Sequence, residues 1–327
     1  MHKSNYTILL TRRLPEKIEN QLVANYKVVL NPKDKPYSYK ELRKKVENID
    51  ILVPCISDTI DSSVLKSAKK LKLIANFGNG VDNIDLITAH EKKIIVTNTP
   101  EVLTQDTADI VLTLILMLSR KVKAAEEKLY MGKWYGWGPS ITHGERLFGK
   151  KLGIIGMGRI GCAVANRAKT LGLKINYHNR KRLSKKIESN YRAKYWNDLN
   201  SMLKEIDILS IHCPYTPETF HLLSKRRIQL MKKTSIIINT SRGEIIDENA
   251  LADQLTSKKI HGVGLDVFEH EPQVSSKLLD SKNAVLLPHI SSATKESRDA
   301  MGMRVLKNID KFSKGLAPPD KVKANSI

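Results

Sequence analysis

The sequence predicts an α/β protein with two doubly wound parallel sheets, and three observations lead to this prediction. Short apolar runs rich in β-branched residues alternate with amphipathic helical segments along the chain, which is typical of parallel sheets covered by helices on both faces. Thr99-Pro100 interrupts this alternation, because the residue before a proline avoids helical backbone. A chain of 327 residues is also long enough for two domains.

The first α/β series lies between Tyr6 and Asn98. Asp61, ahead of the apolar Val64 and Leu65, is a typical start for one of its helices. We expect strands at Tyr6–Thr11, Lys27–Leu30, Asp50–Pro54, Leu71–Asn76 and Ile94–Asn98, separated by helices at Pro15–Ala24, Tyr39–Asn48, Asp61–Lys70 and Ile84–Lys92.

A long helix from Leu103 to Leu129 and an aromatic, glycine-rich loop from Met131 to Pro139 lead to the second series, which begins at Lys151. We expect its strands at Leu152–Ile155, Lys174–His178, Asp207–His212, Ser235–Asn239, Gly262–Val267 and Ala284–Leu287. The expected helices are Ile160–Leu171, Glu218–Met231, Glu248–Thr256 and, near the end of the chain, Thr294–Phe312.

The net charge of +21 is the most unusual feature of the composition. The basic residues are scattered, without an arginine-rich tail or interleaved aromatic residues, so we expect no nucleic-acid partner. A positive field instead favours anionic substrates and a phosphorylated cofactor. The longest apolar stretch, Ile110–Leu118, is shorter than the roughly 18 residues of a membrane span, so we expect no membrane segment.

The 3 cysteines, Cys55, Cys162 and Cys213, lie far apart and form neither a disulfide framework nor a metal-binding spacing. The N-terminus also lacks the apolar core of a signal peptide. We therefore expect a cytoplasmic protein without a bound metal.

A glycine-rich loop opens the second series. Gly156-Met157-Gly158-Arg159-Ile160-Gly161 follows an expected strand and leads into an expected helix. In such a loop the first glycine permits a tight turn, the second lets a pyrophosphate approach the backbone, and the third lets the helix pack on the strand. The free N–H groups of the helix then bind the anion. The loop therefore predicts a dinucleotide site; the alternative is a structural glycine turn.

The end of the next strand indicates which dinucleotide binds. Sites for NAD place an Asp or Glu about 20 residues after the glycine loop, on the ribose hydroxyls. Here the corresponding segment is Asn179-Arg180-Lys181-Arg182, without a carboxylate. Guanidinium groups match a 2′-phosphate well, so we predict that NADP is preferred and NAD remains possible. The alternative is a solvated basic loop.

Several motifs, in this order, resemble those of the D-isomer-specific 2-hydroxyacid dehydrogenases, and among them the glyoxylate/hydroxypyruvate reductases. Besides the glycine loop they are Asn76-Phe77-Gly78-Asn79-Gly80-Val81-Asp82-Asn83-Ile84-Asp85, Asn98-Thr99-Pro100, Ile238-Asn239-Thr240-Ser241-Arg242-Gly243, Asp266-Val267-Phe268-Glu269-His270-Glu271-Pro272 and Pro288-His289-Ile290. The resemblance implies two Rossmann-like or flavodoxin-like domains. A nucleotide-binding domain, 101–291, is inserted into a catalytic domain formed by 1–100 and 292–327, with the active site in the cleft.

The resemblance also implies residue roles. Arg242 corresponds to the substrate-binding and catalytic arginine, His289 to the proton donor, and Glu271, rather than Glu269, to its acidic partner. The N–H groups of Asn79 and Gly80 correspond to those that meet the substrate carboxylate. Further cofactor contacts are implied at Thr107, Cys213, Pro214, Thr219, Thr240, Ser241, Asp266 and Ser291.

The resemblance further implies a homodimer, with Trp137 aligned with a tryptophan that reaches the partner's active site and contacts the substrate. The chain departs from the family at Ser291, where glycine is common after His-Ile. That departure affects the loop beside His289.

The chemistry of 2-oxo acid reduction explains these residue types. A nicotinamide supplies hydride, while the protein supplies position and charge. Arg242 can hold the carboxylate and polarise the carbonyl. His289 can deliver a proton near neutral pH, and Glu271 favours its charged form.

Other functions within and outside the family stay open. Phosphoglycerate dehydrogenase is the nearest alternative, followed by D-lactate dehydrogenase and phosphite oxidation, whereas Glu271 argues against formate dehydrogenases, which carry glutamine there. A non-enzymatic alternative is a nucleotide-sensing transcriptional corepressor.

Overall fold

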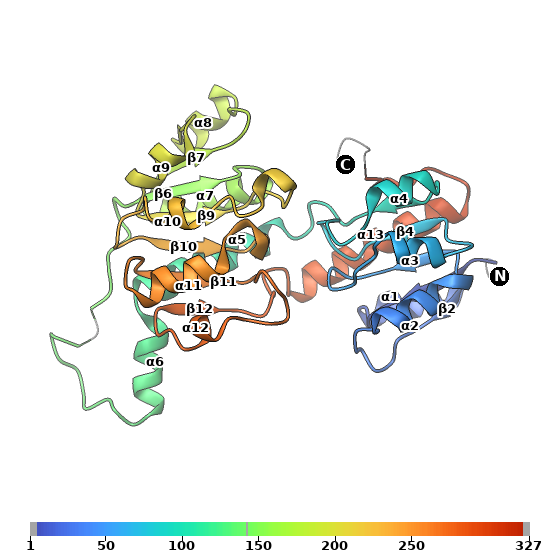
Figure 1. The fold of residues 1–327 in the computed structure, drawn as a ribbon, viewed down its shortest axis with the longest axis horizontal. Helices are drawn as coiled ribbons and strands as arrows, with labels where there is room; N and C mark the ends of the chain where they lie inside the picture. Colours follow the sequence, from blue (N-terminus) through green and yellow to red (C-terminus); the bar gives the residue numbers. More distant parts are fainter. Residues whose placement is uncertain (1–4, 142, 323–327) are drawn as a thin grey trace. The chain divides into compact units, whose positions relative to one another are not determined.

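The computed structural model describes residues 5–141 and 143–322. It divides into two compact units: residues 1–103 with 293–327, and residues 104–292. These units divide after residues 103 and 292, whereas the sequence predicts the domain boundaries after residues 100 and 291. Each unit is an α/β fold built on an entirely parallel sheet (Figure 1). The segment that forms the second unit interrupts the chain of the first, so the predicted fold of two doubly wound parallel sheets, with one domain inserted into the other, is confirmed.

The first unit contains a five-stranded sheet with the order β2-β1-β3-β4-β5. Alternate residues of one strand face opposite sides: Ile8 and Leu10 join one apolar cluster, and Leu9 joins the other. Its elements are β1 (Thr7–Leu10), α1 (Glu16–Asn25), β2 (Lys27–Val29), α2 (Tyr39–Lys45), β3 (Ile51–Val53), α3 (Ser62–Ser67), β4 (Leu73–Ala75), α4 (Leu86–Glu91), β5 (Ile95–Thr97) and the late helix α13 (Lys295–Ser313).

The late helix α13 returns to the first unit, where it packs against α1 and β4. Met301, Val305 and Ile309 bury their side chains in the same cluster as Ile8 and Leu10. Burial of each such side chain stabilises the fold by roughly 1.5–3 kcal/mol, which explains why a segment so distant in sequence completes this unit.

The second unit contains a seven-stranded sheet with the order β12-β11-β10-β9-β6-β7-β8. Chain order reverses between β6 and β9, where ligands bind in open α/β sheets. Its elements are α5 (Thr104–Ser119), α6 (Val122–Tyr130), β6 (Lys151–Ile155), α7 (Arg159–Thr170), β7 (Lys174–His178), α8 (Lys185–Tyr191), β8 (Lys194–Tyr195), α9 (Leu199–Glu205), β9 (Ile208–Ile211), α10 (Lys225–Ile228), β10 (Ile236–Asn239), α11 (Glu248–Thr256), β11 (Gly262–Leu265), α12 (Ser276–Leu279) and β12 (Ala284–Leu286).

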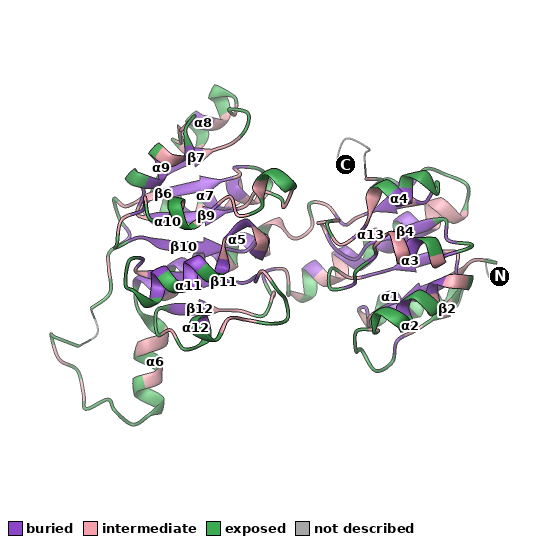
Figure 2. Ribbon diagram, viewed as in Figure 1, coloured by how far each residue is buried: buried purple, intermediate pink, exposed green. Residues whose placement is uncertain are grey.

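The prediction of one long helix from Leu103 to Leu129 is wrong. The structure has two helices, α5 and α6, separated at Lys121, whose backbone is left-handed with φ +52°. The carbonyl of Ser119 accepts the N–H of Glu145, so a distant segment takes the group that would have continued the helix. In Figure 2, α5 is largely buried, whereas α6 has no buried residue.

The predicted helix Glu218–Met231 is also wrong. Only a 3-10 turn at Pro217–Thr219 and the short α10 form there. Between them the N–H groups of His221 and Leu223 donate to the carbonyls of Glu244 and Ile245. These bonds to another loop replace the local bonds that a helix needs. No helix among the described residues has the length and apolar character needed to cross a membrane.

Candidate active site

Three neighbouring strands bring the predicted catalytic side chains together in the second unit. Arg242 follows β10, Glu271 lies in the loop after β11, and His289 lies after β12. These strands are adjacent in the order β12-β11-β10 and run parallel. Their carboxyl ends therefore meet at one edge of the sheet, where ligand sites form in open α/β folds.

A hydrogen bond joins the imidazole of His289 to Glu271. The Nδ1 of His289 lies 2.8 Å from Oε2 of Glu271, and 22% of the His289 side chain is exposed. The other carboxylate oxygen of Glu271 accepts the N–H of Phe268 at 3.1 Å. Burial raises the pKa of Glu271, but the hydrogen bond and charge of His289 outweigh it, so this pKa lies below the ordinary value. Glu271 therefore stays ionised at neutral pH beside the imidazole.

The buried carboxylate of Asp266 holds the loop that carries His289. The N–H groups of Ile290 and Ser291 donate to its two oxygens at 2.7 and 2.8 Å, and the N–H of His289 donates to its carbonyl. Burial raises the pKa of Asp266 above its ordinary value against these bonds. His289 itself has left-handed backbone, φ +54°, an uncommon conformation that the surrounding structure must enforce.

Ser291, the departure from the family pattern, fits this arrangement. It is buried and its φ is not in the left-handed region, so the position has no backbone need for glycine. Its side chain adds a hydrogen bond to Asp266. Ser291 and Asp266 were predicted as cofactor contacts; in this structure both serve the His289 loop.

Arg242 lies in a loop packed tightly against the loop of Glu271. Its Nη1 donates to the carbonyl of Ser241 at 2.7 Å, and its charge lowers the pKa of Glu271. A Cβ on the next residue, Gly243, would lie 1.9 Å from the carbonyl carbon of Phe268. Only glycine permits this approach, which fixes Arg242 against the Phe268–Glu269 peptide.

The glycine loop has the geometry of a phosphate-binding turn. Gly156 has φ +91°, and a Cβ there would lie 2.5 Å from the nitrogen of Cys213. A Cβ on Gly161 would lie 2.6 Å from the carbonyl oxygen of Gly156, which explains how closely α7 packs on β6. A Cβ on Gly158, by contrast, would meet no other side chain or loop within 4 Å. The loop thus leaves open space at the N-terminus of α7, where N–H groups bind anions.

Two orphaned hydroxyls support the fit of a dinucleotide. The Oγ1 atoms of Thr107 and Thr240, both predicted cofactor contacts, are buried without a hydrogen-bond partner. Buried polar atoms are rarely left unpaired, so a ligand that supplies partners would satisfy them. The hydroxyls of Ser241 and Thr219, also predicted contacts, donate instead to the carbonyls of Cys213 and Pro214.

The predicted phosphate-recognition residues differ in their surroundings. The side-chain oxygen of Asn179 accepts the N–H of Met157 at 2.7 Å and so braces the glycine loop. Arg182 makes two bonds of 2.8 Å to the carboxylate of Glu188, which Tyr177 also contacts at 2.6 Å.

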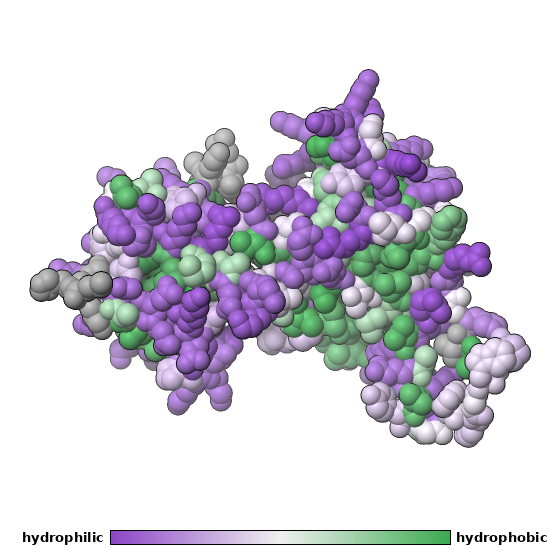
Figure 3. Space-filling model, turned by 180° about the vertical axis from the view of Figure 1, so that it is seen from behind, coloured by the Kyte–Doolittle hydropathy of each residue, from purple (hydrophilic) through white to green (hydrophobic). Residues whose placement is uncertain are grey.

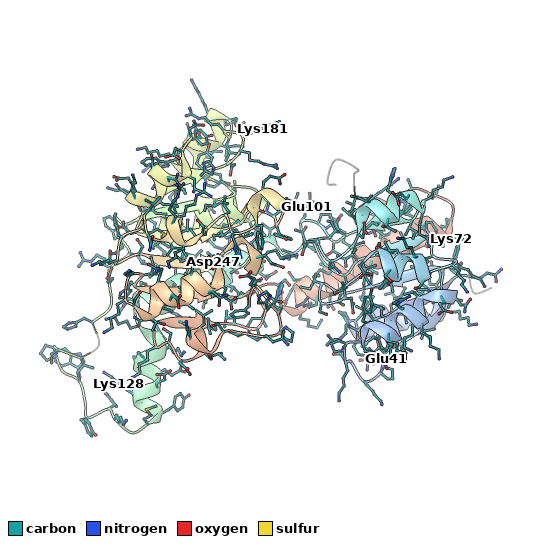
Figure 4. The ribbon with its side chains drawn as sticks, viewed as in Figure 1. Glu41, Lys72, Glu101, Lys128, Lys181 and Asp247 are labelled. Carbon is teal, nitrogen blue, oxygen red and sulfur yellow. The ribbon has the colours of Figure 1, made fainter. Side chains whose placement is uncertain are left out.

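Among the described residues, neither Arg180 nor Lys181 has an ion pair like that of Arg182 with Glu188. Arg180 is exposed, and its charge acts on both Cys213 and Glu218. Burial raises the pKa of Cys213 to about 11 in spite of this charge, whereas the hydrogen bond of Thr216, aided by Arg180, lowers the pKa of Glu218. It therefore lies near the loop after β9, next to the glycine loop. Lys181 is exposed beside α8 (Figure 4).

Asn79 and Gly80, the predicted carboxylate-binding residues, belong to the first unit. The carbonyls of Gly78, Asn79 and Gly80 accept bonds from the N–H of Thr99 and the amides of Asn98 and Asn76, respectively. These bonds fix the backbone of the loop within the first unit. Asn76 and Asn98 were not predicted as site residues, although both lie in the quoted family motifs.

Trp137 lies on the loop after α6 and is 87% exposed. Leu129, Tyr130, Trp134 and Tyr135 are exposed on the same segment. In Figure 3, seen from behind, the green apolar surface lies on the body of the second unit, whereas the projecting loop after α6 is mostly pale. Apolar side chains gathered in this way commonly mark a protein interface.

Comparison with known proteins shows what the chain is similar to. Residues 112–291 match the family described as D-isomer specific 2-hydroxyacid dehydrogenase, NAD binding domain. A glyoxylate reductase of Thermococcus litoralis is 43% identical over 321 residues, which cover 96% of each chain.

Two solved structures extend the comparison. A glyoxylate reductase from Paecilomyes thermophila has a TM-score of 0.87 and 30% identity, and covers 98% of this chain and 99% of its own. An NADPH-dependent glyoxylate/hydroxypyruvate reductase from Sinorhizobium meliloti, in complex with NADP and malonate, has a TM-score of 0.84 and 30% identity, and covers 98% of this chain and 97% of its own.

Proposed function

Since this chain belongs to the D-isomer specific 2-hydroxyacid dehydrogenase family, we propose that it reduces glyoxylate, hydroxypyruvate or both to the 2-hydroxy acid, with NADPH as the preferred reductant. It is an oxidoreductase that acts on CH–OH groups with a nicotinamide cofactor. The observation that carries the proposal is the 2.8 Å bond between His289 and Glu271 beside Arg242.

Each catalytic residue takes the role that its surroundings support. The guanidinium of Arg242 holds the substrate carboxylate and polarises the 2-oxo group. His289 donates a proton to the developing oxyanion from Nε2, because Nδ1 is bound to Glu271. Glu271 orients the ring and stabilises the imidazolium. The N–H groups of Asn79 and Gly80 provide further donors to the carboxylate.

The cofactor supplies a hydride to C2 of the substrate when bound. The glycine loop and the N-terminus of α7 would hold its pyrophosphate, and Thr107 and Thr240 would pair with its polar groups. For the 2′-phosphate we favour Arg180, with Lys181 beside it, over Arg182, because Arg182 already pairs with Glu188. The 3 free cysteines fit a reducing, cytoplasmic location.

A substrate panel tests the proposed reaction. We expect purified protein to oxidise NADPH with glyoxylate or hydroxypyruvate, at a kcat/KM at least about tenfold above that with phosphohydroxypyruvate or pyruvate, as about 1.4 kcal/mol of differential binding provides. Absorbance at the nicotinamide band measures the rate. A higher kcat/KM with phosphohydroxypyruvate would favour the phosphoglycerate alternative. Tight NADPH binding without turnover of any 2-oxo acid would favour the nucleotide sensor.

Substitution of the pair tests the acid chemistry. His289→Gln should lower kcat by roughly a hundredfold or more, because the variant lacks the proton donor. Glu271→Gln removes the anion that favours the imidazolium, so the upper limb of the pH–rate profile should move to lower pH. His270→Gln, in the same loop and exposed, is the matched control and should keep the wild-type profile. Wild-type rates in His289→Gln, or an unmoved limb in Glu271→Gln, would contradict these roles.

Two single arginine variants test cofactor recognition. Arg180→Ala should weaken NADPH binding about tenfold or more and leave NADH binding nearly unchanged, because a charge-assisted bond contributes about 1.5–3 kcal/mol. Arg182→Ala should change the ratio of the two affinities less. Calorimetric titration of both cofactors measures the effect, which should shrink as salt rises. Equal wild-type affinity for NADPH and NADH would identify the segment as a solvated basic loop.

We also propose that the protein is a homodimer in which Trp137 shapes the partner's substrate pocket. The exposed aromatic loop after α6 supports this assignment. Light scattering should give twice the chain mass of 36.9 kDa, and Trp137→Ala should raise the KM for glyoxylate several-fold. Tyr135→Ala, an exposed neighbour, is the control for loss of loop packing. A fully active monomer would overturn the proposal.

A further inference from the structure

A second histidine–glutamate pair involves the loop after β11, the same loop that carries Glu271. The Nε2 of His221 lies 2.8 Å from Oε1 of Glu269, and only 12% of the Glu269 side chain is exposed. Glu269 is two residues before Glu271 but takes no part in the bond to His289. The family roles described above leave this pair without a function.

Glu269 also binds the start of helix α11. Its Oε2 accepts the N–H of Glu248, and the Glu248 carboxylate in turn accepts the N–H of Glu269 at 2.9 Å. These two reciprocal bonds tie the loop after β11 to the helix that follows β10. A carboxylate at a helix N-terminus is also favoured by the helix dipole.

His221 is fixed in its turn by the chain around it. Its N–H donates to the carbonyl of Glu244 at 2.9 Å, its φ is +45°, and its ring stacks on Phe220 with centroids 4.0 Å apart. The neighbouring Leu223 forms a bridge with Ile246. The segment after β9 is therefore attached to the loop after β10, and through His221 to the loop after β11.

The contacts of Gly243, Glu248 and His221 converge on Phe268 and Glu269. Gly243, next to Arg242, packs against the Phe268–Glu269 peptide, and the peptide just before it donates the N–H of Phe268 to Glu271. Movement of the peptide would thus displace Arg242 and the Glu271–His289 pair relative to each other. We infer that His221 and Glu269 are positioning residues that fix the substrate-binding arginine against the proton-donating pair.

This inference rests on the proposed function and predicts a specific loss. His221→Leu removes the donor to Glu269, so the Phe268–Glu269 peptide is released on that side. Misplacement of reacting groups by about 1 Å can cost a hundredfold in rate, and we expect a fall in kcat/KM for glyoxylate of about tenfold or more. The dissociation constant for NADPH should stay within about twofold, because no hydrogen bond among the described residues joins the side chain of His221 or Glu269 to the glycine loop.

A conservative variant separates positioning from general stability. The amide of His221→Gln can donate to Glu269, so this variant should recover most of the wild-type kcat/KM. Circular dichroism melting and calorimetric NADPH binding accompany the kinetics of the wild type, His221→Leu and His221→Gln. Glu269→Gln, which keeps the shape and hydrogen-bonding capacity, should also lose less than Glu269→Ala.

The outcomes are distinct. A selective loss in His221→Leu with recovery in His221→Gln supports the inference. Wild-type kinetics in His221→Leu, or an equal loss in both variants together with weakened NADPH binding and a lower Tm, overturns it while the proposed function stands. A wild-type protein that reduces no 2-oxo acid overturns the proposed function and this inference together.

Discussion

The parallel direction of the strands in the second unit is the constraint on which the candidate site depends. Since β6, β9, β10, β11 and β12 all run the same way, every loop that follows a strand emerges at one edge. The glycine loop, Cys213, Arg242, Glu271 and His289 are each such a continuation. One reversed strand would carry its functional residue to the opposite edge. Sheet direction therefore determines which parts of the sequence meet, and the loops only refine the distances.

At that edge of the sheet, buried carboxylates hold several of the loops in position. The carboxylate of Asp266 accepts the N–H groups of Ile290 and Ser291, and its backbone carbonyl accepts the N–H of His289. The carboxylate of Glu269 holds its own loop to α11. Bonds from N–H groups to an ionised carboxylate are short and strong compared with neutral ones. They allow His289 to keep a left-handed backbone that it would rarely adopt by itself. Asp266 and Glu269 thus hold the loops that carry the candidate catalytic side chains.

The elements that the sequence predicted well are those with local signals. The strands agree within a residue or two at most ends, because runs such as Ile236–Asn239 are apolar and bounded by polar turns. The helix breaks at Lys121 and between Pro217 and Lys225 had no such signal, since bonds from Glu145 and to Glu244 and Ile245 cause them. Prediction of the site is likewise limited to residues that a local motif contains. Arg242, Glu271 and His289 lie in contiguous motifs, whereas the pairs His221–Glu269 and Arg182–Glu188 join residues whose side-chain partners no motif specifies.

The ion pair between Arg182 and Glu188 braces the loop after β7 from within. A loop braced by an internal ion pair keeps its shape when its outward-facing residues change. Arg180 and Lys181 are exposed, and substitutions at exposed positions usually alter stability by no more than about 0.5 kcal/mol. Exchanges at these two positions can therefore alter the charge that the loop presents to a bound nucleotide, with almost no penalty in folding.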